Sequence, residues 1–152
     1  MSIMFENATH KERFEELLTR MGSHDCYHQA IAYLFALNDD CYRHVEQLYD
    51  FHEHGIRPRS LTADTNAWQT GSSWKVCRLA YNLYNGYAYQ QDESGEPKEY
   101  MREDGYAGWL ADTLYTPYHV FDCCHAPFFL EAIKIRYADY FRSVSGLEEM
   151  EE

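Results

Sequence analysis

Residues 72–86 read SSWKVCRLAYNLYNG, a stretch whose apolar residues occupy nearly every side of a helix. These apolar residues are Trp74, Val76, Cys77, Leu79, Ala80, Tyr81, Leu83 and Tyr84. Ser72 or Ser73 can cap the first turn, and Gly86 supplies the stop. A helix that is hydrophobic all round is typical of the protein interior. We therefore predict a helix here, at the centre of a mainly α fold.

Helical spacing of apolar residues continues on both sides of this stretch. The predicted helices cover 9–21, 25–37, 40–53 and 72–86, and a last helix opens at Ala126-Pro127. Thr116-Pro117 reads as a cap followed by proline at the first helical position. The expected fold is a compact single-domain bundle of five or six helices over residues 1–145. Residues 146–152 are rich in glutamate and lack lysine and arginine, which predicts a disordered acidic tail.

Two further segments lie between these helices. Residues 56–72 are predicted as a loop that holds one helical turn around 61–68. Residues 87–102 are predicted as a small β-hairpin, because tyrosines alternate with other residues over 87–91 and a turn sequence rich in Gly, Ser and Pro follows. In that hairpin, 87–91 would pair with 98–102.

The charge balance restricts the class of partner. The chain has 152 residues, with 25 Asp and Glu against 13 Lys and Arg, a net charge of −12. Such a field repels phosphate groups, so we expect no direct binding to nucleic acid and no binding to an anionic membrane. It suits a protein partner with a basic surface.

The cysteines and the hydropathy pattern bear on the compartment. There are five cysteines, an odd number, and the N-terminus has no basic segment followed by an apolar run. Free thiols and a cytoplasmic location are the expected consequence. No run of about 18 apolar residues predicts a membrane span.

The densest cluster of metal-ligating side chains runs from His119 to His125. His119 and Cys123 are four residues apart, so one helix face would bring them together, and Cys124 lies beside them. The cluster could serve a small metal- or cysteine-dependent enzyme. Against this, the chain has no Cys-x-x-Cys pair, and no basic residues surround the thiols. We expect no cofactor and no metal, with His119, Cys123 and His125 as the alternative set of ligands.

A polar stripe interrupts the apolar stretch at 72–86. It consists of Arg78, Asn82 and Asn85, which fall on one side of a helix. Buried polar groups need partners, so the favoured interpretation is a structural network that joins Arg78 to Glu131 and Gln69. The alternative is a small-ligand cleft formed by the stripe and nearby aromatic side chains, namely Trp68, Trp74, Tyr81 and Tyr84.

Tyrosines and carboxylates are interleaved between residues 87 and 106. Aromatic side chains supply contact area and carboxylates supply electrostatic steering, so the mixture is typical of a protein-binding surface. A solvated loop would show the same composition, and that alternative stays open. The predicted partner-binding residues are Tyr89, Asp92, Glu93, Glu96, Glu99, Tyr100, Glu103 and Asp104.

Several segments resemble a family of uncharacterised small proteins found in clostridial and related Firmicutes genomes and their mobile elements. The segments are 68–72, 75–86 and 126–140, and residues 5–10 fit the opening of that family. The resemblance implies a cytoplasmic bacterial or phage context. The family has no established activity, so no catalytic residue is carried over from it.

These observations favour a non-enzymatic acidic binding protein that engages a basic protein surface. One specific version is a nucleic-acid mimic that inhibits a host defence nuclease, as anti-CRISPR proteins from phage and mobile elements do. Two alternatives remain: an enzyme built on residues 119–125, and an aromatic-lined ligand binder built on residues 68–85.

Overall fold

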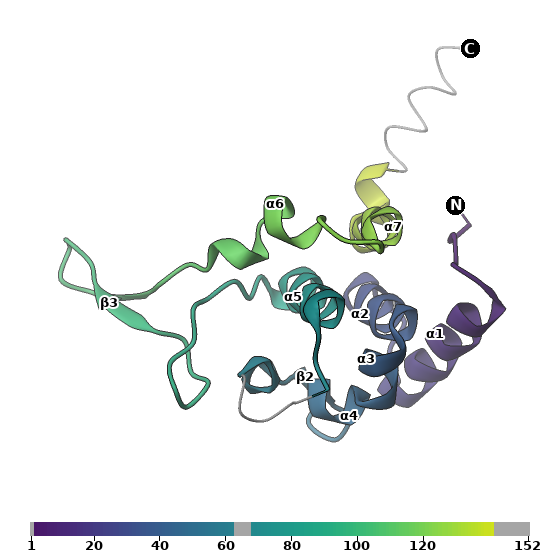
Figure 1. Ribbon diagram of the computed structural model, residues 1–152, viewed down its shortest axis with the longest axis horizontal. Coiled ribbons are helices and arrows are strands. Elements are labelled where there is room, and N and C mark those ends of the chain that lie inside the picture. The colour runs from purple at the N-terminus through teal and green to yellow at the C-terminus, as the bar shows by residue number, and fades with distance from the viewer. Residues whose placement is uncertain (1, 63–67, 142–152) are drawn as a thin grey trace, which may run out of the picture.

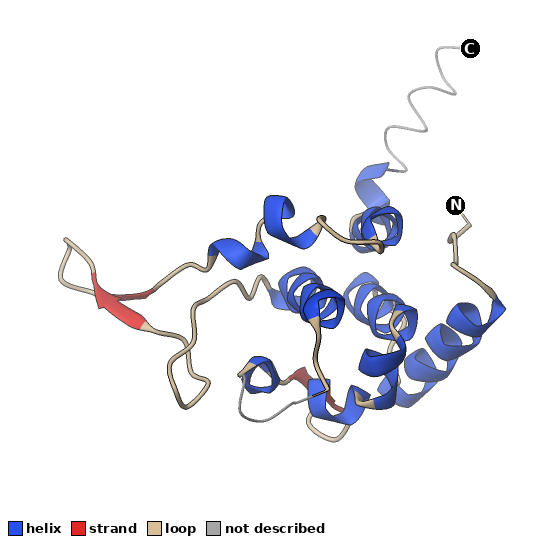
Figure 2. Cartoon of the chain, in the orientation of Figure 1, coloured by secondary structure: helices blue, strands red, loops and turns tan. Residues whose placement is uncertain are grey.

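The computed structural model describes residues 2–62 and 68–141 and is mainly helical, as predicted (Figures 1 and 2). The longer helices are α1 (Ala8–Met21), α2 (Cys26–Leu37), α5 (Gly71–Asn85) and α7 (Ala126–Arg136). The short ones are α3 (Asp39–Arg43), α4 (Val45–Leu48) and α6 (Pro117–Val120), with 3-10 turns η1 (Pro58–Leu61) and η2 (Thr113–Tyr115). The predicted tail at 146–152 and residues 63–67 of the predicted turn lie outside the described residues.

Helix α2 lies at the centre of the fold and packs against α1, α5 and α7 (Figure 1). Every residue from Ala30 to Leu37 is buried. The prediction of a helix over 72–86 is confirmed, and its inner face is buried, but its position at the centre is wrong. Trp74, Arg78 and Tyr84 on α5 stay half-buried, because such side chains bury an apolar body while the polar end keeps contact with water.

Local sequence signals set several helix ends as predicted. Asp25 caps α2, and its carboxylate accepts a hydrogen bond from the His28 N–H at 2.8 Å. Gly22 and Gly86 end α1 and α5 with φ of 69° and 79°. This left-handed conformation is one that glycine adopts without strain. Thr116 precedes α6, whose first residue is proline, as predicted.

Two helices begin at other residues than predicted. Helix α1 begins at Ala8, one residue before the predicted start at residue 9, and the side chain of its cap Asn7 accepts a hydrogen bond from the His10 N–H at 2.8 Å. Helix α5 begins at Gly71 behind Thr70, which forms a reciprocal capping box with Ser73. In both cases a second hydrogen-bonding residue near the predicted cap takes the role, because Ser, Thr and Asn are similar in cap preference.

The predicted helix over 40–53 is wrong beyond residue 48. The chain forms α3 and α4, which meet at His44, and then turns into the two-stranded antiparallel sheet of β1 (Tyr49–Asp50) and β2 (Gly55–Ile56). The Asp50 carboxylate accepts hydrogen bonds from the backbone N–H groups of His52 and Glu53, both at 2.9 Å. Aspartate forms turns of this kind readily, and the turn replaces the last part of the predicted helix.

A hairpin is present, but its second strand is another segment than predicted. The strands that pair are β3 (Glu99–Met101) and β4 (Ala107–Trp109), in an antiparallel sheet. Part of the predicted pairing survives, since the Lys98 N–H donates to the Gln90 carbonyl at 2.8 Å. Gly105 has φ of 87° in the turn between the strands, and Asp-Gly at 104–105 is a strong hairpin signal that outweighs the earlier turn.

Candidate protein-binding site

The segment from residue 87 to 112 projects from one end of the helical body (Figure 1, left). Its three passes are joined through the backbone. The Lys98 N–H donates to the Gln90 carbonyl at 2.8 Å, the Gln90 N–H to the Leu110 carbonyl at 3.0 Å, and the Leu110 N–H to the Lys98 carbonyl at 2.8 Å. We call residues 87–112 the meander. Its backbone has a defined shape although it contains little regular strand.

A series of aromatic rings connects the meander to the helical body. Tyr115 lies 6.1 Å from Tyr87 between ring centroids, Tyr87 lies 5.1 Å from Tyr89, and Tyr89 lies 4.9 Å from Trp109. The Tyr87–Tyr89 and Tyr89–Trp109 pairs meet edge to face, an arrangement in which aromatic rings attract each other. Burial raises the pKa of Tyr87 to about 12, so its hydroxyl stays neutral at physiological pH. The rings therefore anchor the meander without buried charge.

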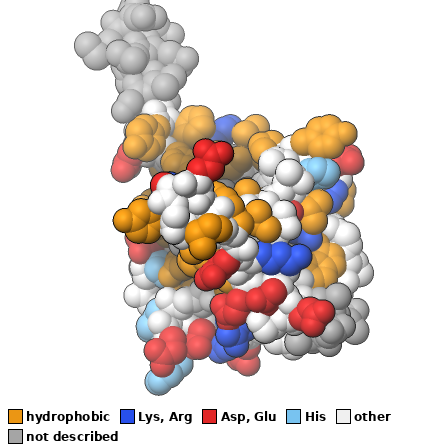
Figure 3. All heavy atoms as spheres, turned by 90° about the vertical axis from the view of Figure 1, so that its left-hand side faces the viewer, with side chains coloured by type: hydrophobic (Ala, Val, Ile, Leu, Met, Phe, Trp, Pro, Cys, Tyr) orange, Lys and Arg blue, Asp and Glu red, His pale blue; other side chains and the backbone are white. Residues whose placement is uncertain are grey.

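The outer part of the meander exposes large apolar side chains. Met101 and Tyr106 are each 73% exposed, Trp109 is 52% exposed and Tyr100 is 45% exposed. Figure 3 shows this end of the molecule, where hydrophobic side chains gather in the middle of the face and acidic side chains lie beside and below them. An exposed group of apolar side chains with a polar border is typical of a protein-interaction surface.

Three of the predicted acidic residues have structural partners. Asp92 accepts hydrogen bonds from the Ser94 N–H and hydroxyl and from the Glu96 N–H. The hydrogen bond from the Ser94 hydroxyl is the main reason that the pKa of Asp92 is lowered. Glu96 forms an ion pair with Arg59. These carboxylates hold the first turn of the meander in place, and Asp104 does the same for the second turn through Arg102 at 2.8 Å.

The remaining predicted carboxylates are exposed to solvent. Glu93, Glu99 and Glu103 are exposed, and none of the ion pairs among residues 2–62 and 68–141 includes them. Tyr100 is exposed, and its ring lies so close to Gly108 that an added Cβ there would be 2.9 Å from it. Tyr89 is half-buried between Tyr87 and Trp109. The meander thus combines free carboxylates with exposed rings.

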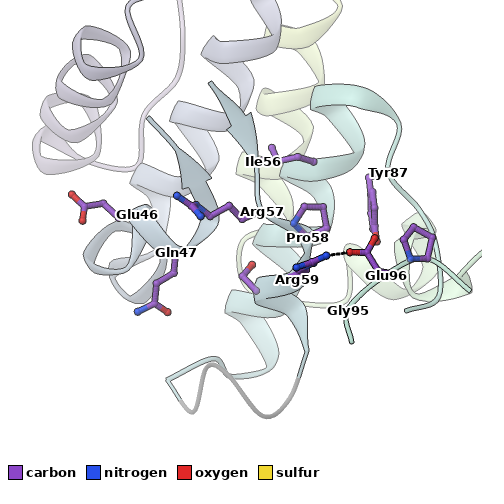
Figure 4. Close-up of a pocket in the computed structure, with 11 residues that line it drawn as sticks. Glu46, Gln47, Ile56, Arg57, Pro58, Arg59, Tyr87, Gly95 and Glu96 are labelled. Carbon is purple, nitrogen blue, oxygen red and sulfur yellow. Dashed lines mark hydrogen bonds and ion pairs between the residues drawn. The ribbon is translucent and has the colours of Figure 1, made fainter. Parts of the chain in front are cut away.

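A pocket of about 760 Å³ lies where the first turn of the meander meets β2 and η1 (Figure 4). Arg57 in this pocket pairs with Asp50 at 3.0 Å, and Arg59 pairs with Glu96. Gly95 approaches Arg59 so closely that an added Cβ would be 2.9 Å from its Cγ. Both guanidinium groups are therefore paired with carboxylates of the protein itself. The Arg59–Glu96 ion pair attaches the first turn of the meander to η1, and we call this contact region the joint.

The residues of the predicted ligand cleft point to different places. Tyr81 is fully buried and its hydroxyl is 2.8 Å from the Ser60 hydroxyl. Trp68 stacks on His44 with centroids 4.3 Å apart, and its indole N–H donates to the Gln47 side chain of α4 at 2.9 Å. Trp74 lies under the Arg78 guanidinium, 5.6 Å from its ring centroid. The structure therefore does not bring these three aromatic rings together in one cleft.

The polar stripe on α5 has mostly structural partners. The Asn82 amide donates to the Tyr87 carbonyl at 3.4 Å, and the Asn85 side chain accepts from the Tyr87 N–H at 3.2 Å. The predicted contact between Arg78 and Glu131 is wrong, because the Glu131 carboxylate accepts a hydrogen bond from the Met4 N–H at 2.6 Å. The stripe thus fixes the first residue of the meander and leaves Arg78 without a carboxylate partner among the described residues.

Gln69, the other predicted partner of Arg78, bonds to a different residue. Its side-chain amide donates to the Ser60 carbonyl at 3.2 Å, so it joins the start of α5 to η1. This bond lies within the buried region that also holds the Tyr81 hydroxyl, and it helps to position the joint beneath the meander.

The histidine and cysteine side chains between residues 119 and 125 have separate contacts and differ in exposure. Helix α6 ends at Val120, so His119 and Cys123 do not share a helix face. The Cys123 thiol contacts the Val120 carbonyl at 3.7 Å, and Cys124 is exposed. His125 packs against Phe129, and burial lowers its pKa. Within the described part of the chain, no group of three or more His, Cys, Asp or Glu side chains is arranged to hold a metal ion.

The fold and this site define a small, mainly helical domain with a projecting, aromatic and acidic β-meander. The chain belongs to a family of unknown function, DUF6075, whose model matches residues 1–149. No curated protein and no solved structure matches the chain. No helix in the described residues is long and apolar enough to cross a membrane.

Proposed function

We propose that the protein is a non-enzymatic cytoplasmic binding protein that docks on a basic protein surface through the outer part of the meander. The observation that carries this proposal is the exposure of Met101, Tyr106 and Trp109 on a support fastened to the core. Leaving such side chains in water is unfavourable at about 25 cal/mol per Å² of apolar surface. A partner that covers them gains this free energy.

The charge around these rings supports a basic partner. Glu99 and Glu103 lie on the same hairpin and take part in no ion pair among the described residues. Free carboxylates beside an apolar patch steer a cationic surface toward it and disfavour an acidic one. The net charge of −12 acts in the same direction over longer distances.

A narrower form of the proposal is a nucleic-acid mimic, such as an anti-CRISPR inhibitor of a defence nuclease encoded by phage or a mobile element. A mimic needs carboxylates spaced like phosphates. Here Asp92, Glu96 and Asp104 are engaged in turns or ion pairs, and exposed rings lie among the others. This arrangement favours a mixed aromatic and acidic contact over a row of phosphate-like charges.

Site-specific photo-crosslinking tests the proposal. A photoreactive amino acid replaces Tyr106 on the meander, or Glu15 on the exposed side of α1 as the control, and each protein is mixed with lysate of the encoding organism. We expect the Tyr106 position to crosslink a basic protein that the Glu15 position does not. Equal crosslinking from both positions, or an acidic protein at Tyr106, would contradict the proposal.

A further inference from the structure

A second pocket lies between α5 and the segment formed by η2 and α6, away from the apolar patch of the meander. It has a volume of about 490 Å³ and three basic side chains in its lining: Lys75, Arg78 and His119. Asp122 is the one carboxylate among the lining residues. In a chain with a net charge of −12, this pocket reverses the sign of its surroundings.

The two permanent cations of this pocket have no ion-pair partner in the part of the chain that the structure describes. None of the ion pairs among the described residues includes Lys75 or Arg78, whereas Arg57 and Arg59 are paired. The Lys75 ammonium donates one hydrogen bond to the Asp122 backbone carbonyl at 2.5 Å, so two of its N–H groups and its charge remain. The Arg78 guanidinium lies over the Trp74 ring, and this contact leaves its N–H groups able to donate hydrogen bonds.

Their placement on one helix brings the two cations together. Lys75 and Arg78 are three residues apart on α5, so their side chains leave the same face. Arginine offers a planar fork of N–H donors and lysine a compact charge, and both are common ligands of phosphate oxygens. A doubly charged anion between them would neutralise both groups at once.

The rest of the lining is apolar. Leu114, Pro117 and Phe121 form part of the wall. Tyr118, which is 85% exposed, lies against His119 with ring centroids 5.0 Å apart. An anion that carries an apolar or aromatic group would therefore contact both parts of the pocket, whereas a bare inorganic ion would use only the cationic side.

We propose that this pocket binds a small organic phosphate in which the phosphate carries an apolar or aromatic group. Arg78 and Lys75 bind the phosphate oxygens, and Leu114 and Phe121 contact the organic part. The exposed rings of the meander do not line this pocket, whereas Arg78 also borders a hollow lined by Asp92, Glu93 and Asp112. The proposed site also gives a role to Arg78. Asn82 and Asn85, the other two residues of the polar stripe, bond to Tyr87.

Phenyl phosphate, inorganic phosphate and phenol are suitable probes, measured by calorimetry and by amide chemical shifts on the whole chain. We expect phenyl phosphate to bind most tightly and to shift the amides of Lys75, Arg78 and 114–122. Arg78→Gln and Lys75→Gln should each weaken binding about tenfold or more, the loss expected for a charged hydrogen bond. The matched control Lys98→Gln removes an exposed lysine of the meander and should leave binding unchanged.

This inference is overturned if phenyl phosphate shows no saturable binding, if Lys98→Gln weakens binding equally, or if the chemical shift changes are confined to other parts of the chain. Inorganic phosphate binding as tightly as phenyl phosphate would also contradict it, since the apolar wall would then contribute nothing. Circular dichroism of each variant establishes that it is folded. If Arg78→Gln is unfolded, the shift map of the wild-type protein and the Lys75→Gln variant still decide the question.

Discussion

The ring of Tyr89 meets the ring of Trp109 edge to face, with centroids 4.9 Å apart and planes at 72°. Tyr89 also contacts Tyr87, which is 9% exposed and belongs to the core. Trp109 itself is 52% exposed, so one side chain both fastens the hairpin and forms part of its outer surface. A surface held in this way loses little conformational entropy when a partner binds.

Replacement of Tyr89 by alanine should loosen the meander. The variant loses the contacts with both Tyr87 and Trp109, and we expect the free energy of unfolding to fall by about 1–3 kcal/mol. Urea denaturation measures this loss. Hydrogen exchange over residues 88–110 should be faster in the variant than in the wild-type protein, and this increase should be larger than any increase over α2. The control Tyr118→Ala removes a side chain that is 85% exposed and should change stability by less than about 0.5 kcal/mol. Equal effects of the two changes would contradict the anchoring role.

The core prediction concerns α2. Leu34 is fully buried between the neighbouring helices, so Leu34→Ala should cost about 2–5 kcal/mol through lost burial and the cavity left behind. Leu130 on α7 is 50% exposed, and Leu130→Ala should cost much less. Thermal and urea unfolding give both values. A loss of stability at Leu130 as large as that at Leu34 would show that α2 is not the centre of the core.

The protonation of His10 should affect stability. His10 is buried, its Nδ1 lies 3.1 Å from the Glu6 N–H, and its Nε2 lies 2.9 Å from the Tyr33 carbonyl. The neutral ring satisfies both groups by accepting from Glu6 and donating to Tyr33. Burial is the largest of the influences that lower the pKa of His10. A proton on Nδ1 would remove the acceptor for the Glu6 N–H.

The sign of the pH effect follows from this lowered pKa. The unfolded chain, with a histidine pKa of about 6.5, takes up the proton at a higher pH than the folded chain. Stability is therefore complete above that pH and falls as the pH drops toward the folded pKa. Unfolding midpoints between neutral and mildly acidic pH should show this decline, and His10→Gln should reduce its slope. The control His24→Gln, at an exposed site, should leave the slope unchanged. An NMR titration that gives an unshifted pKa for His10 would contradict the prediction.

Much of the helical architecture could be predicted because its signals are local. Asp25, Gly22 and Gly86 act on their own helix ends and were sufficient to place them. The end of the helix predicted over 40–53 depends on the local turn at Asp50 and also on a contact farther along the chain, because Arg57 pairs with Asp50. Contacts of this kind leave no periodic pattern in the sequence.

The candidate site was predictable in composition but not in the role of each residue. The interleaving of tyrosine and carboxylate indicated the segment that forms the projecting meander in the structure. It could not show that Asp92 forms a turn or that Glu96 pairs with Arg59, because each of these roles depends on the register of the meander. Met101, Tyr106 and Trp109 were missing from the predicted set of partner-binding residues. The Asp104-Gly105 sequence is the signal that places these three residues on one hairpin.

The proposed partner surface should be separable from fold stability. Tyr106→Ala and Met101→Ser remove side chains that are each 73% exposed, so the melting temperature should barely change. If these side chains form the centre of the contact, the affinity for the partner captured by crosslinking should fall by about 1 kcal/mol or more for at least one of them. Unchanged affinity for both variants would place the contact elsewhere on the protein.

The most direct test of the central claim is the association rate of that captured partner with a charge-reversed meander. Glu99→Lys with Glu103→Lys is compared with the control Glu12→Lys with Glu15→Lys on α1, which changes the net charge equally. Salt shortens the Debye length from about 10 Å at 0.1 M to about 3 Å at 1 M. The account predicts that the wild-type rate falls with salt and that the meander reversal slows association far more than the α1 reversal. A rate that is indifferent to salt, or equally slowed by both reversals, would contradict it.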